Sequence, residues 1–413
     1  ALLIASGAPV QAQQSELELL RAQIGELTAR LSKLEEEQST AAAAAKTKAA
    51  SSPNVTSKLP LQITGLFQIH SLNYFSQNGP AADANDTFRL RRGEIRLTAP
   101  TITPRISATA QLDFAKASSR LRVPAIPAGG GAVPVQNLDT RARDSVLQEL
   151  QISYLLNKGT NGSSYIDVGQ YKIPIGYESL VSSSALPLVD RALIFTQRDP
   201  FDGSYGDQRD TGVQLRGSRG PIDYRLGVFN GFGDRQNALA LSDPKAVLGR
   251  LAYRSPQGFE VGVSGGVGNT GTGAGAPRAD RNLFNVFGAY KKNKLSFQAE
   301  YLTGDAQLQT GASARDISGY YGQVGYAFTP KIEGIFRYDY LDANRQAAAG
   351  VDSKVRDLIL GVNYYIKGNN AKIQTNLVRR SGAQGLPPAG GGGLTSDIVN
   401  DRTELRTNFQ IAF

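Results

Sequence analysis

Cysteine, methionine and tryptophan are absent from the 413-residue chain, and there is a single histidine, His70. The missing cysteines exclude a disulfide framework, a thiolate metal site and a cysteine nucleophile. One histidine also excludes a metal site built from several imidazoles, and a serine–histidine–aspartate triad would have to use His70. We therefore expect no metal and no cofactor.

Long apolar runs are missing as well. No stretch approaches the roughly 18 apolar residues that a membrane-spanning helix needs. The chain is 40% hydrophobic and 20% charged, so it either folds in water or crosses a membrane as a closed β-barrel. Its formal net charge of +9 lies after residue 60, because residues 1–60 hold six basic and six acidic residues.

The first sixty residues differ in character from the rest. Residues 1–12 read as the remnant of a secretory signal peptide with cleavage after Ala12. In residues 13–38, leucine and isoleucine alternate at spacings of three and four, as in a short α-helical coiled coil, at Leu17, Leu20, Ile24, Leu27, Leu31 and Leu34. The spacing does not separate a dimer from a trimer, and an amphipathic helix packed on its own domain is the alternative. Residues 39–60, rich in alanine, serine and lysine, read as a linker.

From Leu61 onward apolar and polar residues alternate, which indicates strands with one apolar face. We predict sixteen strands, at residues 61–75, 87–98, 104–116, 144–157, 163–173, 210–218, 221–231, 246–255, 258–269, 281–291, 294–304, 318–328, 331–341, 354–367, 371–381 and 402–413. Short and long connections alternate along the chain, which is typical of outer-membrane barrels with short periplasmic turns and long extracellular loops. The predicted fold is all-β, a 16-stranded antiparallel transmembrane β-barrel over residues 61–413.

The strand at 331–341 shows how the two faces divide. Ile332, Phe336, Tyr338 and Tyr340 fall on one face, and the charged residues of the segment fall on the other. A charge facing lipid at the bilayer midplane costs about 2–4 kcal/mol, so the charged face must line the interior. The chain ends "ELRTNFQIAF", again with alternating apolar residues and a terminal aromatic. We expect this last strand to close the barrel against the first.

Several motifs resemble the phosphate-selective porin O and P family. They are a double arginine early in the second strand and a Gly-Gln-aromatic-Lys-x-Pro run that enters a long loop. A glutamate followed by serines and an acidic-arginine pair comes next, and then "GVQL" and "FNG". The matching residues are Arg91, Arg92, Gly169, Gln170, Tyr171, Lys172, Pro174, Glu178, Ser182, Ser183, Asp190, Arg191, 212–215 and 229–231. The resemblance implies a homotrimeric porin of the bacterial outer membrane. Sixteen strands place both ends of the barrel on the short-turn side, so we expect the N-terminal segment in the periplasm.

The resemblance and strand parity together suggest which residues line the pore. The basic candidates are Arg89, Arg91, Arg92, Arg96, Lys172, Arg191, Arg216, Arg225 and Arg250, and the acidic candidates are Glu178, Glu300, Glu333, Asp339 and Asp357. The alternation of apolar residues shifts by one position within the second strand, which implies a β-bulge there. The sequence therefore does not decide whether Arg91 faces the lumen or the membrane. By analogy with porins, the loop at 174–209 is expected to fold into the lumen; an extracellular flap is the alternative.

We expect a basic wall facing a more acidic one across the lumen, and a weak preference for small anions as transported solutes. The opposing interpretation is that these arginines only neutralise neighbouring carboxylates. The sequence does not decide whether the channel is specific for phosphate. The expected function is passive diffusion of small hydrophilic solutes. The alternative is a structural anchor whose coiled coil contacts the cell wall. Outer-membrane lipid is an expected partner, and nucleic acid is not. An enzymatic alternative is a lipid hydrolase, which needs a nucleophile beside a base on the outer face of the barrel. By strand parity His70 faces the lumen, so we expect no enzymatic activity.

Overall fold

The computed structural model describes residues 25–26, 30, 32–33, 61–78, 86–115, 146–196, 208–232, 245–270, 279–308, 314–346, 352–382 and 401–413. The chain separates into two units, Ala1–Pro60 and Leu61–Phe413. The five described residues of the first unit are helical, and Arg30 donates a 2.8 Å hydrogen bond to Glu26 one turn earlier. The signal-peptide remnant, the linker and most of the coiled coil lie outside the described residues and stay predictions. No helix in the described ranges is long and apolar enough to cross a bilayer.

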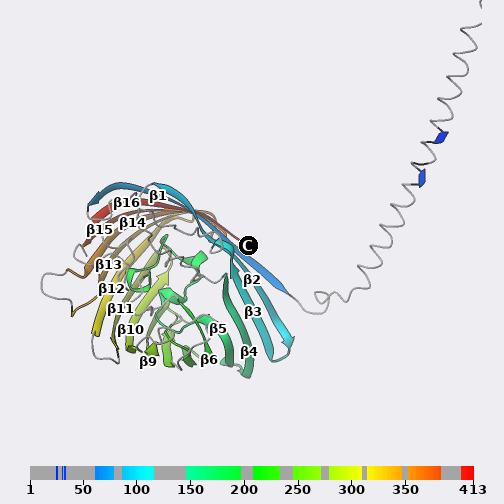
Figure 1. Ribbon diagram of the computed structural model, residues 1–413, viewed down its shortest axis with the longest axis horizontal. Coiled ribbons are helices and arrows are strands. Elements are labelled where there is room, and N and C mark those ends of the chain that lie inside the picture. Colours follow the sequence, from blue (N-terminus) through cyan, green and yellow to red (C-terminus); the bar gives the residue numbers. More distant parts are fainter. Residues whose placement is uncertain are drawn as a thin grey trace, which may run out of the picture. The chain divides into compact units, whose positions relative to one another are not determined.

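The second unit is a closed antiparallel sheet of sixteen strands, in which each strand pairs with its sequence neighbours and β1 pairs with β16. Figure 1 shows the ring, with β16 beside β1. The strands are β1 (Gln62–Asn78), β2 (Thr87–Thr103), β3 (Ile106–Asp113), β4 (Leu147–Gly159), β5 (Gly162–Lys172), β6 (Arg209–Arg219), β7 (Ile222–Phe229), β8 (Ala246–Arg254), β9 (Phe259–Thr270), β10 (Ala279–Lys292), β11 (Leu295–Leu308), β12 (Ala314–Thr329), β13 (Ile332–Asp342), β14 (Lys354–Lys367), β15 (Ala371–Gly382) and β16 (Asp401–Ala412). The predicted barrel and strand number are confirmed.

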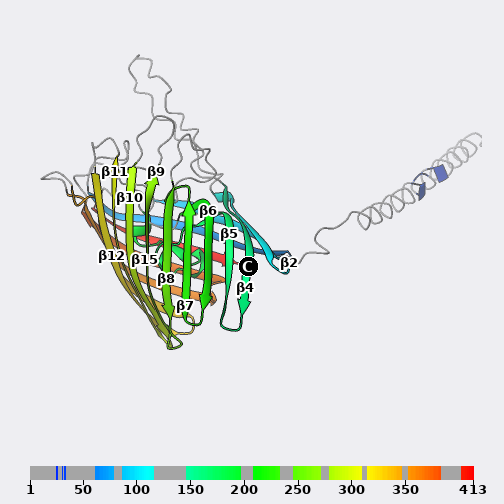
Figure 2. The ribbon, with the colours of Figure 1, turned by 90° about the horizontal axis from the view of Figure 1, so that it is seen from below.

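The connections alternate in length as the sequence predicts. Seven of them are turns of two to four residues, and they join β2 to β3, β4 to β5 and every second pair after that. The side view in Figure 2 places these tight turns at one end of the barrel. The predicted turn at "APTITP" is narrower in the structure, because β2 continues to Thr103 through a register shift after Ala99.

The two faces of the sheet differ in polarity. On β14, Leu358, Leu360 and Val362 point outward and are 47–59% exposed, while Asp357 and Asn363 point inward and are at most 3% exposed. Such a continuous apolar outer surface is stable against hydrocarbon and not against water. The interior is correspondingly polar, with many glutamine, asparagine, arginine and carboxylate side chains buried there.

The expected bulge in β2 is present at Arg91. Gln68 of β1 pairs with Arg92, and the next residue, Ile69, pairs with Leu90, so Arg91 has no partner across the ladder. An extra residue in one strand re-aims the side chain there. Both members of the double arginine can therefore point inward although they are adjacent in sequence.

The barrel closes at its last residue. The amide of Gly65 donates to the carbonyl of Phe413 at 2.8 Å, and the amide of Phe413 donates to the carbonyl of Gly65 at 3.1 Å. The Phe413 ring packs edge-to-face on Phe67, with centroids 5.6 Å apart. A Cβ on Gly65 would lie 2.3 Å from this ring, so glycine is required for the ring to cover the strand. The terminal aromatic thus seals the seam between β1 and β16.

We predict that Phe413→Ala weakens closure by about 1–2 kcal/mol, because the ring pair and the cover over Gly65 are both lost. The folded fraction can be followed by heat-modifiable gel migration during urea titration of the refolded barrel. Phe297→Ala is the matched control, since Phe297 is another half-exposed outward aromatic, on β11, far from the seam. Equal losses in the two variants would contradict a special role for the seam.

Candidate functional site

A loop fills part of the barrel interior. After β5 the chain turns inward and forms three short helices, η2 (Glu178–Leu180), η3 (Ser183–Ala185) and α3 (Leu193–Thr196). In Figure 1 these green segments lie inside the ring of strands. The loop's carbonyls and amides bond to inward-facing side chains of β1, β14, β15 and β16. The prediction that the loop folds into the lumen is confirmed for its described residues 174–196.

Apolar packing holds one side of this loop against the wall. Ile175, Ile194 and Phe195 are at most 2% exposed and belong to a single buried cluster with inward-facing side chains from β7 to β14. The wall contributes Phe229, Ala246, Leu248, Leu283, Leu302, Ile317, Tyr321, Leu341 and Val355. Burying each large apolar side chain contributes about 1.5–3 kcal/mol. This arc of the barrel is therefore closed by the loop.

Buried carboxylates fix the loop backbone. Glu300 of β11 accepts the amides of Tyr177 and Glu178, both at 2.8 Å, and the hydroxyl of Tyr321, also at 2.8 Å. Asp339 of β13 accepts the amide of Leu193 at 2.9 Å. A buried carboxyl group that accepts backbone N–H groups satisfies donors that would otherwise lack a partner. Side chains of two strands thus hold the loop at two points, near Glu178 and at Leu193.

Glu178 completes this anchor from within the loop. Its carboxylate accepts the amide of Ala192 at 2.7 Å and pairs with Arg337 of β13. Glu178 and Glu300 are 1% and 3% exposed. The expectation that these two glutamates line the open pore is wrong, because the loop covers them. The acidic wall expected across the lumen is correspondingly reduced.

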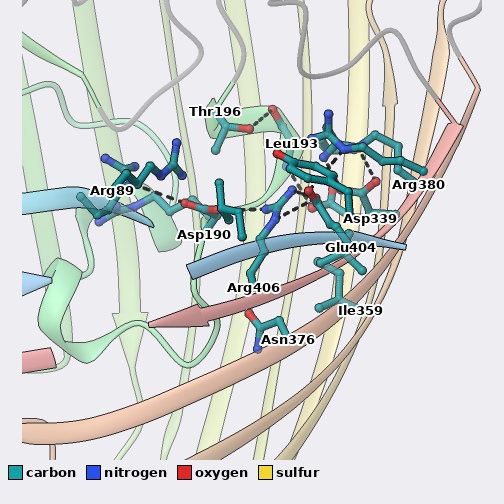
Figure 3. A pocket seen from close by; sticks show the side chains of 17 residues that line it. Arg89, Asp190, Leu193, Thr196, Asp339, Ile359, Asn376, Arg380, Glu404 and Arg406 are labelled. Carbon is teal, nitrogen blue, oxygen red and sulfur yellow. Dashed lines mark hydrogen bonds and ion pairs between the residues drawn. The ribbon is translucent and has the colours of Figure 1, made fainter. Parts of the chain in front are cut away.

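Several arginines lie around a cavity near the seam between β1 and β16. This cavity of about 200 Å³ lies between the loop and the wall formed by β1, β2 and β13 to β16. Figure 3 shows its lining, with Asp190 between Arg89 and Arg406. The charged lining residues are six arginines, Arg89, Arg91, Arg191, Arg380, Arg402 and Arg406, and four carboxylates, Asp190, Asp339, Asp357 and Glu404. With all groups ionised, the cavity carries two surplus positive charges.

Asp190 connects the loop to this cluster. Its carboxylate accepts a 3.0 Å hydrogen bond from Arg406 of β16 and lies 3.6 Å from Nε of Arg91 in β2. Burial pushes the pKa of Asp190 upward, but the guanidinium groups of Arg406 and Arg91 outweigh it and hold the pKa well below its usual range. Asp190 is therefore ionised throughout the neutral pH range. Its stabilising contacts disappear only when the pH falls below the range in which aspartate ordinarily titrates.

The arginines of this cluster differ in their hydrogen-bond and ion-pair partners. Arg380 binds both oxygens of Asp357, at 2.7 and 2.5 Å, and Arg406 also pairs with Glu404. Arg191 donates to the carbonyls of Glu178 and Val181 at 3.1 and 2.6 Å. Arg89 is exposed, and its guanidinium lies 3.5 Å from Nδ1 of His70. Of the six, Arg89 is the one with neither a carboxylate nor a carbonyl partner in the described ranges.

The other predicted basic residues lie inside the barrel, each beside a polar or acidic partner. Arg92 donates to Gln68 at 2.6 Å, Arg96 pairs with Glu149, and Arg216 pairs with Asp167. Arg250 contacts Asp223 and Glu260 at 2.7 and 2.5 Å, while Arg225 is 4.0 Å from Asp223. Lys172 donates to the carbonyl of Ser179 at 2.5 Å. For these residues the structure favours local neutralisation over an open basic wall.

Glu333 lies apart from the arginine cluster. It accepts hydrogen bonds from Tyr365 at 2.5 Å and Asn363 at 3.1 Å, and it borders a cavity of about 460 Å³ near the short-turn end. In the strands and loop that the structure describes, no three aspartate, glutamate or histidine side chains converge as a metal site requires. The described interior is lined by polar and charged side chains and is partly occupied by the loop.

Sequence reasoning missed three cavity arginines, Arg380, Arg402 and Arg406. A signal was present, because Arg402, Glu404 and Arg406 occupy alternate positions of the last predicted strand and so share one face. Their importance depends on Asp190, which is 216 positions from Arg406 in sequence. Only the path of the loop brings these two residues together.

The sequence profile of the family described as "Putative beta-barrel porin-2, OmpL-like" matches residues 74–399. The match spans well over half of the chain, which therefore belongs to this family of outer-membrane porins. The porin class is confirmed, whereas the closer resemblance to phosphate-selective porins O and P is not shown by this match and stays a prediction. No curated protein sequence matches the chain.

Solved porins share the fold at low identity. In vitro folded OmpT of Vibrio cholerae has a TM-score of 0.56 at 10% identity, over 86% of this chain and 97% of that one. The anion-selective porin from Comamonas acidovorans has a TM-score of 0.55 at 13% identity, over 86% and 99%. The outer membrane channel DcaP of Acinetobacter baumannii has a TM-score of 0.52 at 12% identity, over 86% and 97%. At such identities the comparison establishes the barrel architecture.

We predict that Glu300→Gln loosens the loop. The amide group of glutamine cannot accept both backbone N–H bonds, and an unsatisfied buried donor costs about 1–3 kcal/mol. Single-channel recordings in planar bilayers should show more frequent conductance fluctuations than the unmodified protein. Glu333→Gln is the matched control, because among the described residues the Glu333 carboxylate accepts hydrogen bonds only from barrel side chains. This variant should give the same conductance traces as the unmodified protein. A quiet Glu300→Gln channel would argue against the anchor.

Proposed function

We propose that this porin is a passive diffusion channel for small hydrophilic solutes with a weak preference for anions. The observation that carries the proposal is the arginine-lined cavity beside the inward-folded loop, with its surplus of positive charge. A narrow, low-dielectric passage strengthens the field of such a surplus. Pores lined by rings of arginine or lysine favour anions.

The preference is weak because most of the arginines are paired. Arg380 and Arg406 hold carboxylates at 2.5–3.0 Å, so their charge is largely cancelled nearby. Arg89, exposed and without a carboxylate partner in the described part of the chain, contributes most directly to the surplus. One open guanidinium attracts any small anion, whereas tight phosphate binding uses several paired donors. We therefore rank general anion preference above phosphate selectivity.

Two comparisons agree with this proposal without deciding it. One structural neighbour is named as an anion-selective porin, although it shares only 13% identity with this chain. The double arginine and the loop motif that resemble the phosphate-selective porins lie within the barrel, and Arg91 and Arg191 border the cavity. Phosphate remains the solute to test first among anions.

We further propose a homotrimer with its N-terminal segment in the periplasm. One neighbour, OmpT of Vibrio cholerae, is described in a trimer form. An even number of strands places both ends of the barrel on the short-turn side, which is periplasmic in outer-membrane barrels. Three copies of the predicted coiled coil in residues 13–38 would then associate with one another in the periplasm.

We predict anion selectivity in a planar bilayer under a potassium chloride gradient. Arg89→Gln should lower the anion-to-cation permeability ratio by about twofold, since one partly screened charge near the path is worth ~0.5 kcal/mol. Arg105→Gln is the matched control, because this exposed arginine lies in the short turn between β2 and β3, away from the cavity. A cation-selective unmodified channel would refute the proposal. A chloride current unchanged by added phosphate would remove any phosphate affinity while leaving anion preference intact.

The second candidate function, a structural anchor, rests on the heptad spacing and the linker that follows it. It is compatible with a channel. Deleting residues 13–60 should leave single-channel conductance unchanged and release the outer membrane from the cell wall, measured as increased vesicle shedding. Unchanged shedding would leave the channel as the protein's function. Lost conductance would mean that the segment is needed for the barrel itself.

A further inference from the structure

Two arginines stand on the outside of the barrel. Arg356 of β14 and Arg379 of β15 are exposed, while the residues on either side of each are buried in the interior. Strand alternation therefore directs both side chains toward the surrounding membrane. A charge facing hydrocarbon is costly, so both residues need an environment other than acyl chains.

Their position along the strands supplies that environment. β14 begins at Lys354 and β15 ends at Gly382, so each arginine lies within three residues of the long-connection end. In this class of barrel, long connections face the cell exterior. The two arginines therefore lie at the depth of the headgroups of the outer leaflet.

Neighbouring aromatic rings mark the same depth. The guanidinium carbon of Arg356 lies 5.8 Å from the ring centre of Tyr340 on β13. Tyr340 in turn stacks on Tyr320 of β12, with ring centres 5.1 Å apart. Outward tyrosines gather at the boundary between hydrocarbon and headgroups. Arg356 is thus held over an aromatic platform at that boundary.

Register brings the two arginines close together. Arg356 is opposite Ser381, and Arg379 is opposite Leu358, so the arginines are diagonal neighbours on one face. Such neighbours are roughly 7–8 Å apart at the backbone. Arg379 also donates a 3.0 Å hydrogen bond to the hydroxyl of Thr403 on β16.

Neither arginine has a carboxylate partner among the residues that the structure describes, in contrast to the arginines of the interior cavity. A nearby rim arginine, Arg345, is different, because it pairs with Asp316. Two adjacent, unneutralised guanidinium groups repel each other, and an anion placed between them removes that repulsion. The geometry suits a phosphate group, which accepts several charge-assisted hydrogen bonds at once.

We propose that Arg356, Arg379 and Thr403 form an external site for a phosphate group of an outer-leaflet glycolipid, with Tyr340 beside its sugar. A lipid is favoured over free phosphate because the site faces the membrane, where acyl chains keep the headgroup in place. Lys354, two residues from Arg356 on the same face, adds a third positive charge at the outer edge. This site is separate from the channel and does not depend on what passes through it.

The test uses the full chain in detergent micelles and bisphosphorylated lipid A as the probe, with native mass spectrometry to count bound lipid. The unmodified protein should retain the lipid and bind its phosphate-free form far more weakly. Each of Arg356→Gln and Arg379→Gln should weaken binding about fivefold, and the double variant about thirtyfold. Arg345→Gln, at the same end but paired with Asp316, should bind like the unmodified protein.

Gel migration of unheated samples confirms that each variant is folded, and Arg356→Lys/Arg379→Lys provides a second test with both charges kept. This lysine variant should bind with intermediate affinity. Equal binding of phosphorylated and phosphate-free lipid, or an unaffected double glutamine variant, would overturn the proposal. A double variant that changes subunit number while binding lipid normally would identify the arginines as a contact between copies of the chain, and would overturn it as well.

Discussion

The hydrogen bonds between β1 and β16 are the interaction on which the rest of this structure depends. Hydrocarbon offers no partner to a backbone N–H or C=O group, so a sheet that crosses a membrane is stable only when its two edges meet. Here the first and last strands pair antiparallel from Leu66 and Ala412 to Asn78 and Asp401, and Phe413 extends the seam to Gly65. Once the ring is closed, alternation along every strand must separate an apolar outside from a polar inside.

Closure also determines which charges meet in the interior. Because β16 pairs with β1, and β1 with β2, the arginines of the last strand lie close to those of the second. Arg91 and Arg406 are far apart in sequence, yet both contact Asp190. The loop divides the remaining space, since its apolar side packs on β7 to β14 and Asp190 points toward the seam. The arginine cavity is therefore a consequence of ring closure combined with an amphipathic loop.

Local alternation was enough to predict the strands and their faces. The predicted segment at 354–367 coincides with β14, and the parity switch in the second strand located the bulge at Arg91. The two-residue alternation along a strand shows which side chains face inward, but it does not show which of them other parts of the chain cover. Glu300 has the parity of a lumen residue, but it serves as a buried acceptor for the loop amides. The path of the loop depends on its packing inside the closed barrel, and a single-strand pattern does not contain that information.

The carboxylates among the arginines fit the requirements of the proposed channel. Six unpaired guanidinium groups around one small cavity would repel each other strongly and would hold an anion too tightly for it to leave. Asp190, Asp357 and Glu404 cancel most of that charge. Asp190 remains ionised because, against the effect of burial, the guanidinium groups of Arg406 and Arg91 hold its pKa below the usual range. What is left is a modest positive surplus beside the exposed Arg89. A passage that conducts anions needs an attraction of this size, strong enough to admit them and weak enough to release them.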